Sequence, residues 1–198
     1  MVGIPCSGKT TRANIIAKYL QENLSLEVIV INEELLGLNK VEYYKDSTQE
    51  KILRGSLRSN VEKYLDQKRV VILDSMNYIK GFRYELYCLA RNSITNLMVV
   101  FCDTDREVAQ KLCHEGGYEN PFPAEYFEDY ANRLERPNQS NRWDNPLFHL
   151  RYNEETPLED IAKTVSDGKK PRDPISTKPV NQALQKVIGT YVCHKLYL

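Results

Sequence analysis

The chain has 198 residues, of which 41% are hydrophobic and 27% charged, and this composition is typical of a globular domain rather than a disordered or fibrous protein. Lys and Arg together number 27, as do Asp and Glu, so the chain lacks the overall positive field that attracts nucleic acids nonspecifically. We therefore expect no DNA partner, and any RNA contact must come from a local patch. The most apolar run, Leu97–Cys102, is far shorter than the ~20 residues of a membrane-spanning helix. We expect an intracellular protein without a membrane partner.

The cysteine pattern argues against disulfides and zinc. The five cysteines are odd in number and include no C-x-x-C pair, so a disulfide scaffold is not expected. The His–Cys neighbours at 113–114 and 193–194 match no zinc-ligand spacing, so we predict no structural zinc.

Apolar periodicity predicts alternating helices and strands. A helix follows Lys9, with apolar residues at the spacing of one buried face, and a second is expected to begin with a capping box formed by Ser47 and Glu50. Further helices are predicted over 82–92 and 105–113. Strands rich in β-branched residues are predicted over 26–31, 70–73, 97–102 and 147–152. Strands that are apolar on both faces are typical of a parallel sheet covered by helices on both faces, so we predict an α/β fold.

Residues 114–146 interrupt this alternation with a Gly-Gly pair and four prolines, and we predict an inserted helical lid. A last helix should begin with Thr156 as its N-cap and Pro157 as its first residue. We assign 1–165 to one domain, the polar, proline-containing stretch 166–182 to a linker, and 183–198 to the start of a second, helical domain.

The segment Gly3–Thr10 reads G-I-P-C-S-G-K-T, the full G-x-x-x-x-G-K-[ST] pattern of a phosphate-binding loop, and a helix follows it as that loop requires. Glycines let backbone N–H groups turn toward phosphate oxygens, and the helix N-terminus adds partial positive charge. Lys9 would then reach the outer phosphates of a nucleotide, and Thr10 would bind Mg²⁺. The sequence therefore predicts a phosphate-binding loop for a nucleotide with Mg²⁺.

A magnesium nucleotide site also needs a carboxylate at the end of a neighbouring strand. Asp74 directly follows the strand predicted over 70–73 and fits this role. Taken alone, an aspartate at a strand end is as often a turn or capping residue.

Two further sets of charged residues have open interpretations. Glu33 and Glu34 follow the strand predicted over 26–31, where one of them could act as general base or orient water, or both could be a solvated turn. Arg133, Arg136 and Arg142 in the lid either neutralise charge on a transferring phosphoryl group or form surface ion pairs.

Between residues 51 and 91, nine basic residues face four acidic ones, with four aromatic residues interleaved at Tyr78, Phe82, Tyr84 and Tyr87. Such a run is either an RNA-binding surface or, more often, a solvated helix face.

The stretch 74–88, which reads D-S-M-N-Y-I-K-G-F-R-Y-E-L-Y-C, is more specific than the phosphate loop. Together with the opening G-I-P-C-S-G-K-T-T and the segment R-W-D-x-P-L-F at 142–148, it resembles the Kti-twelve family, the killer-toxin-insensitive P-loop ATPases associated with the Elongator complex. The resemblance covers about residues 1–160. It implies an adenylate-kinase-like ATPase domain with a mobile lid, tRNA-stimulated ATP hydrolysis, and support for Elongator's modification of wobble uridines in tRNA, in the cytoplasm or also in the nucleus. The nearest relative of that family is the kinase that phosphorylates seryl-tRNA on the route to selenocysteine.

The resemblance also assigns roles to individual residues. The loop residues that would bind ATP and magnesium are Gly3, Ile4, Pro5, Cys6, Ser7, Gly8, Lys9, Thr10 and Thr11. Asp74 would complete the metal site. Glu33 stands at the acidic position after the second strand, which is commonly Asp in relatives, so its catalytic role is open.

The two ends depart from the family pattern. Only Met1 and Val2 precede Gly3, so the central strand that normally carries a phosphate loop is nearly absent. Family members continue after the linker into a helical tRNA-binding domain, and we expect weakened tRNA affinity here.

Three functions are therefore weighed. The first is a tRNA-stimulated ATPase that supports Elongator. The second is a tRNA or small-substrate kinase, since loop, metal and lid serve both reactions. The third is a nucleotide-binding adaptor of Elongator with negligible turnover.

Overall fold

The computed structural model describes residues 1–115 and 121–167. The start of the second domain predicted over 183–198, and nearly all of the linker predicted over 166–182, lie outside the described residues. None of the helices in the described part is long and apolar enough to cross a membrane.

The described chain alternates helices and strands as the periodicity predicts. Its elements are α1 (Lys9–Leu24), β1 (Glu27–Ile31), α2 (Lys40–Tyr43), α3 (Ser47–Tyr64), β2 (Arg69–Leu73), α4 (Lys80–Asn92), β3 (Val99–Asp103), α5 (Arg106–Glu115), the 3₁₀ turn η1 (Ala124–Tyr126), α6 (Phe127–Asn132), β4 (Leu147–Arg151) and α7 (Leu158–Ser166). The short helix α2 was not predicted, because four residues are too few to show a helical period.

The strands pair in parallel, as predicted. β1 lies beside β2 with Ile31 opposite Leu73, and β3 lies beside β4 with Asp103 opposite Arg151. Met1 and Val2 lie between the two pairs. The Val2 N–H donates to the Val100 carbonyl over 2.8 Å, and the Met1 amino group donates to the Leu73 carbonyl over 2.9 Å. The spatial order is therefore β1, β2, Met1–Val2, β3, β4.

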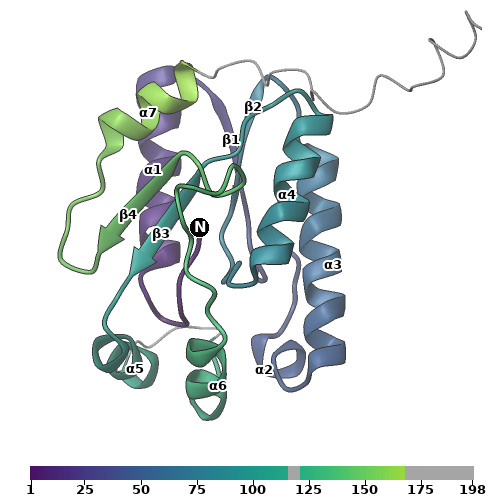
Figure 1. Cartoon of the computed structure of the whole chain (residues 1–198), viewed down its shortest axis with the longest axis vertical. Coiled ribbons are helices and arrows are strands. Elements are labelled where there is room, and N and C mark those ends of the chain that lie inside the picture. The colour runs from purple at the N-terminus through teal and green to yellow at the C-terminus, as the bar shows by residue number, and fades with distance from the viewer. Residues whose placement is uncertain (116–120, 168–198) are drawn as a thin grey trace, which may run out of the picture.

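Helices cover both faces of these strands. On one face, α1 and α7 pack over an apolar cluster that includes Ala13, Leu20, Ile72 and Val100. On the other face, α3 and α4 join a larger cluster with the segments around α5 and α6. Figure 1 shows α1 and α7 on one side of the strands, α3 and α4 on the other, and α2, α5 and α6 at one end of the molecule.

The predicted lid packs as part of the core over its described residues. Phe127 is fully buried and Tyr130 and Ala131 nearly so, in the same cluster as Leu53 and Phe82 of α3 and α4. In the described part of this segment, helix occurs at the end of α5, in η1 and in α6. The predicted insertion therefore shares the apolar core of the domain.

Both predicted helix caps are wrong by one residue. Asp46, not Ser47, caps α3, since its carboxylate accepts from the N–H groups of Thr48 and Gln49 at 2.9 Å each. Ser47 is instead the first residue of the helix. At α7 the cap position is Pro157, and the Thr156 hydroxyl accepts a hydrogen bond from the Arg12 guanidinium over 3.0 Å. A tertiary contact thus replaces the local cap.

Candidate functional site

The phosphate loop leads from Val2 to the N-terminus of α1. Gly8 caps this helix in the left-handed region with φ 82°, where glycine is favoured. At Gly3 a Cβ atom would lie 2.4 Å from the Ser7 Oγ and 2.7 Å from the Cys102 carbonyl oxygen, so the close packing of the loop excludes a side chain there. The Thr104 hydroxyl donates to the Ser7 carbonyl over 3.1 Å and ties the loop to the end of β3.

The Lys9 ammonium lies inside this loop. It donates to the Ile4 carbonyl over 2.5 Å, to the Gly3 carbonyl over 3.2 Å and to the Ser7 Oγ over 3.3 Å. Burial lowers the pKa of Lys9, and the nearby acidic groups, Asp74 among them, partly oppose that shift. A cation that the loop itself holds with neutral oxygens is well placed to exchange them for the oxygens of a phosphate.

Asp74 and Thr10 lie beside each other in the structure. Asp74 follows β2, is 3% exposed, and accepts a hydrogen bond from the Thr10 side chain. Burial raises the pKa of Asp74, while this hydrogen bond and the charge of Lys9 lower it. A hydroxyl and a carboxylate are hard oxygen ligands of the kind that Mg²⁺ prefers, and Mg²⁺ typically adds waters and phosphate oxygens to one or two such groups. The donor set therefore fits the predicted metal.

The two glutamates after β1 have different surroundings. Glu33 is buried, and its Oε1 accepts from the Tyr44 hydroxyl over 2.7 Å and from the Ser75 hydroxyl over 2.8 Å. Glu33 also lies close enough to Lys9 and Asp74 to influence their pKa values. Glu34 points to solvent and pairs with Lys40 at 3.7 Å. The alternative of a solvated turn is thus wrong for Glu33 and right for Glu34.

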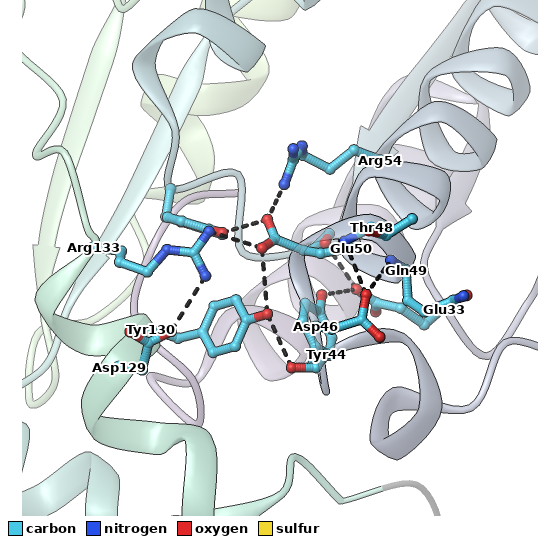
Figure 2. Close-up of polar contacts among 12 residues, drawn as sticks. Glu33, Tyr44, Asp46, Thr48, Gln49, Glu50, Arg54, Asp129, Tyr130 and Arg133 are labelled. Atoms are coloured by element: carbon cyan, nitrogen blue, oxygen red, sulfur yellow. Dashed lines mark hydrogen bonds and ion pairs between the residues drawn. The ribbon is translucent and has the colours of Figure 1, made fainter.

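The lid arginines contact acidic and aromatic groups at three separate places in the described structure. Arg133 pairs with Glu50 at 2.8 Å (Figure 2). Its guanidinium lies over the rings of Tyr78 and Tyr130. Arg136 forms an ion pair with Asp103 at the end of β3.

Arg142 lies over the Tyr87 ring on α4, with 6.0 Å between the guanidinium carbon and the ring centroid, and five residues before β4 begins. Because the phosphate loop lies at the carboxyl end of the parallel strands, Arg142 is near the opposite end of the sheet. The interpretation of Arg142 as a catalytic residue is therefore not supported by its position. The ion-pair alternative describes Arg133 and Arg136.

The basic run over 51–91 includes ion pairs in two settings. Arg58 pairs with Glu62 and Arg69 with Glu27 at the surface, whereas Arg54 pairs with the buried Glu50 and Arg83 with the buried Asp144. The exposed pair on α3 favours the alternative of a solvated helix face at Arg58, and Arg54 and Arg83 instead pair with buried carboxylates.

Two buried arginines were missed by the sequence reasoning. Arg12 on α1 donates to the carbonyls of Arg151 and Glu154 at 2.6 and 2.8 Å, and so fixes α1 to the turn after β4. Arg83 on α4 pairs with Asp144 at 2.7 Å. Arg83 is next to Phe82 on the buried face of α4. Its place on that face was the signal from which its burial could have been predicted.

Comparison with known proteins decides the family. Residues 1–189 match the family model described as "Chromatin associated protein KTI12". The chain belongs to the Kti12 family. It is 37% identical to the Kti12 homologue of Xenopus laevis over 198 residues, which cover 99% of this chain and 69% of that protein. It is 34% identical to Kti12 of Saccharomyces cerevisiae, with 93% of this chain and 62% of that protein covered.

Kti12 relatives are longer than this chain. It spans 65% of the Danio rerio homologue and 50% of the homologue from Oryza sativa subsp. indica. The activities of those whole proteins are therefore only proposed for this chain.

Solved structures agree with the Kti12 assignment. Chaetomium thermophilum Kti12 in complex with ADP-AlF3 is 33% identical, with a TM-score of 0.75, and the match covers 84% of this chain and 95% of that chain. The APS kinase CysC of Mycobacterium tuberculosis in complex with AMPPNP and APS is 19% identical with a TM-score of 0.58 and shows the fold alone. The predicted α/β P-loop fold of the kinase-like class is thus confirmed.

The sequence predicts no structural zinc, and this prediction concerns clusters of Cys, His and acidic side chains. No group of three or more His, Cys, Asp or Glu side chains that could hold a metal occurs within 1–115 and 121–167. Among the described cysteines, Cys6, Cys88, Cys102 and Cys113 are free thiols.

Proposed function

We propose that this chain binds ATP with Mg²⁺ and hydrolyses it, and that tRNA stimulates the hydrolysis. The observation that carries the proposal is the convergence of Lys9, Thr10 and Asp74 at a glycine-lined loop before a helix N-terminus. The solved relative from Chaetomium thermophilum, bound to ADP-AlF3, supports the same ligand class for this family.

Each residue has a distinct part in this proposal. The loop N–H groups and the N-terminus of α1 bind the phosphates, and Lys9 neutralises the outer ones. Thr10 and Asp74 would hold Mg²⁺, which would neutralise charge on the phosphates. Glu33, held by Tyr44 and Ser75, presents a carboxylate beside the loop that orients the attacking water or takes its proton.

For the biological role, we propose that the ATPase supports Elongator-dependent modification of wobble uridines in tRNA. Membership of the Kti12 family and the string of residues at 74–88 support this role. The partners would be the Elongator complex and tRNA, in the cytoplasm or also in the nucleus.

The test is steady-state hydrolysis of γ-labelled ATP by the full chain, with and without bulk tRNA. We expect free phosphate to form, more rapidly with tRNA, and Lys9→Ala to abolish turnover and weaken ATP binding by roughly 10- to 100-fold, because a charge-assisted contact is lost. Lys18→Ala is the matched control, since Lys18 lies on the same helix and pairs with Glu22 in solvent. Unchanged hydrolysis by Lys9→Ala would exclude this loop as the site.

Two other results would redirect the assignment. Label transferred to tRNA or to a small hydroxyl compound would indicate a kinase. ATP binding without turnover, together with Elongator association that survives Asp74→Asn in a pull-down, would indicate an adaptor.

A further inference from the structure

The orientation of the Glu33 carboxylate depends on a side chain outside the phosphate loop. Tyr44, the residue directly after α2, is 4% exposed, and its hydroxyl donates to Oε1 of Glu33 over 2.7 Å. The Ser75 hydroxyl donates to the same oxygen over 2.8 Å. Both of these hydrogen bonds end at Oε1, so they fix the carboxylate through that oxygen.

The local chain does little to fix Tyr44 itself. The helix α2 has four residues, none of them buried, and Lys45 and Asp46 after Tyr44 are exposed. A segment with so few buried contacts of its own is held by contacts from elsewhere in the fold. Tyr130 of α6, inside the predicted lid, supplies two of them. Its hydroxyl lies 3.0 Å from the Tyr44 carbonyl oxygen, and the two rings meet edge to face with their centroids 5.2 Å apart.

Glu50 of α3 fixes Tyr130 in turn. The Tyr130 hydroxyl also lies 3.3 Å from Oε2 of Glu50, so its one proton is shared between this carboxylate and the Tyr44 carbonyl. Arg133 donates to the same Glu50 oxygen over 2.8 Å, and its guanidinium carbon lies 4.7 Å from the centroid of the Tyr130 ring. Figure 2 shows the contacts that run from Glu50 through Tyr130 and Tyr44 to Glu33.

Tyr78 has the same surroundings as Tyr130 except for the contact with Tyr44. Both tyrosines are 3% exposed, both hydroxyls donate to Glu50, and their rings meet edge to face at 5.7 Å. The described hydrogen bonds and ring contacts join Tyr78 to Glu50 and Tyr130, and not to Tyr44. Tyr78 therefore shares the structural role of Tyr130 and lacks its connection to Glu33, which makes it a matched control.

We propose that Tyr130 is a positioning residue for ATP hydrolysis, which holds Tyr44, and through Tyr44 the Glu33 carboxylate, in the orientation that acts on the attacking water. The inference rests on the proposed function, because it assumes that Glu33 acts on water. Neither Tyr130 nor Tyr44 belongs to the phosphate loop. A change at Tyr130 should therefore alter turnover without removing a contact to the nucleotide.

The first test compares Tyr130→Phe with Tyr78→Phe, since both substitutions remove one hydroxyl and keep the buried ring. Tyr130→Phe should lower kcat by about 5- to 10-fold and change the Kd for AMPPNP by less than about 2-fold, because one ordinary hydrogen bond on the path to Glu33 is lost. Tyr78→Phe should lower the melting temperature by a similar amount and change kcat by less than about 2-fold. Equal losses of kcat in the two variants would overturn the proposal, because they would follow from the Glu50 contacts alone.

The second test asks whether Tyr130 acts through Glu33. If it does, adding Tyr130→Phe to Glu33→Gln should change kcat in single-turnover measurements by less than about 2-fold, since the carboxylate that Tyr130 positions is already absent. The same loss in the Glu33→Gln background as in the parent chain would mean that the two residues act independently. That result would overturn the proposal.

The third test needs no hydrolysis. Burial and the charge of Glu33 raise the pKa of Tyr44 well above its ordinary value of 10.0. A pH titration of the Tyr44 ring by NMR should show this pKa falling toward 10.0 in Tyr130→Phe, as Tyr44 moves away from Glu33, and staying near the parent value in Tyr78→Phe.

An unchanged Tyr44 pKa in Tyr130→Phe would overturn the proposal whether or not the chain hydrolyses ATP. A lowered Tyr44 pKa in a chain that shows no turnover would overturn the proposed hydrolysis and still support the positioning of Glu33 by Tyr130. The failure of the proposed function and the failure of this inference are thus distinguishable.

Discussion

The Tyr44 hydroxyl donates a hydrogen bond of 2.7 Å to the same Glu33 oxygen that accepts from Ser75, the residue next to Asp74. Tyr44 itself is 4% exposed, and Tyr130 donates to its backbone carbonyl over 3.0 Å. A single tyrosine thus connects the acidic residue beside the phosphate loop with the helix α6 inside the predicted lid.

Removal of that hydroxyl should impair both stability and turnover. Tyr44→Phe leaves one Glu33 oxygen with a single donor, and we expect the free energy of unfolding to fall by about 1–3 kcal/mol. The rate constant kcat should fall more than the affinity for ATP, because in the proposed mechanism Glu33 acts on the attacking water rather than on the nucleotide. Tyr43→Phe, at the partly buried last residue of α2 and next to Tyr44, is the control. An unchanged kcat in Tyr44→Phe would remove Glu33 from the mechanism.

The burial of Tyr44 also predicts how stability depends on alkaline pH. Burial, with the nearby Glu33 charge, raises the pKa of Tyr44 well above its ordinary value of 10.0. In the unfolded chain the phenol ionises near that ordinary value, so the contribution of Tyr44 is complete below it and is lost as the pH rises toward the folded-state pKa. Chemical denaturation between pH 9 and pH 11 should therefore show a smaller loss of stability in Tyr44→Phe than in the parent chain.

Asp74→Asn should separate stability from function. Since burial raises the pKa of Asp74, its contribution to the stability of the nucleotide-free chain is complete below its ordinary value of 3.8 and is lost as the pH rises through the folded-state pKa. Asp74→Asn should then melt at a higher temperature than the parent at pH 7, and the difference should shrink as the pH falls toward the ordinary value of 3.8. With Mg-ATP at 100 times Kd the parent gains about 2.7 kcal/mol, and the variant should lose most of that gain. A variant that keeps the full Mg-ATP gain would contradict the assignment of Asp74 to the metal.

The helices and strands were predictable from the sequence because each shows a regular local spacing of apolar residues. Ala13, Ile16, Ala17 and Leu20, whose spacing predicted α1, are all buried in one cluster. The phosphate loop was predictable for a similar reason, since Gly3 to Thr10 are contiguous. The prediction for Asp74 needed one further step, namely that the carboxyl ends of neighbouring parallel strands lie at the same edge of the sheet.

The partners of the charged side chains were not predictable in the same way. Arg133 meets Glu50, which is 83 residues away in the chain, and nothing local distinguishes that contact from a solvated ion pair. Arg142 was expected near the site because it belongs to the predicted lid. The chain that leads into β4 instead runs beside α4, where Arg142 lies over the ring of Tyr87. The cap of α3 was wrong because Asp46 and Ser47 are both good capping residues, and only the backbone geometry selects between them.

Glu50 should be more important to stability than other acidic residues of α3. Its carboxylate is 1% exposed and accepts from Arg133 at 2.8 Å, from Tyr130 at 3.3 Å, and from Arg54 and Tyr78 (Figure 2). Glu50→Ala leaves several buried donors without an acceptor, and we expect a loss of about 3–5 kcal/mol in denaturant unfolding. Glu62→Ala on the same helix removes only an exposed pair with Arg58 and should change stability by less than about 1 kcal/mol. Equal effects of the two substitutions would show that the Glu50 contacts add little.

The buried pair of Arg83 and Asp144 should be strongly coupled. Arg83 is 2% and Asp144 0% exposed, their contact is 2.7 Å long, and Arg83 also donates to the carbonyls of Asn77 and Tyr78 at 3.1 Å each. Asp144→Asn leaves the Arg83 charge buried without its counter-ion and should cost about 3–5 kcal/mol. In the double variant with Arg83→Met the buried charge is gone, so the loss should be clearly smaller than the sum of the two single losses.

A double-mutant cycle by denaturant unfolding measures this coupling, and the exposed pair of Arg58 and Glu62 supplies the control cycle. We expect a coupling of about 1–3 kcal/mol for the buried pair and less than about 0.5 kcal/mol for the exposed one. Because Asp144 also accepts from the Asn138 N–H and the Asn141 side chain at 3.1 Å each, it fixes the chain before β4 against α4. Single losses that simply add in the double variant would mean that these two amide contacts, and not the ion pair, hold that segment in place.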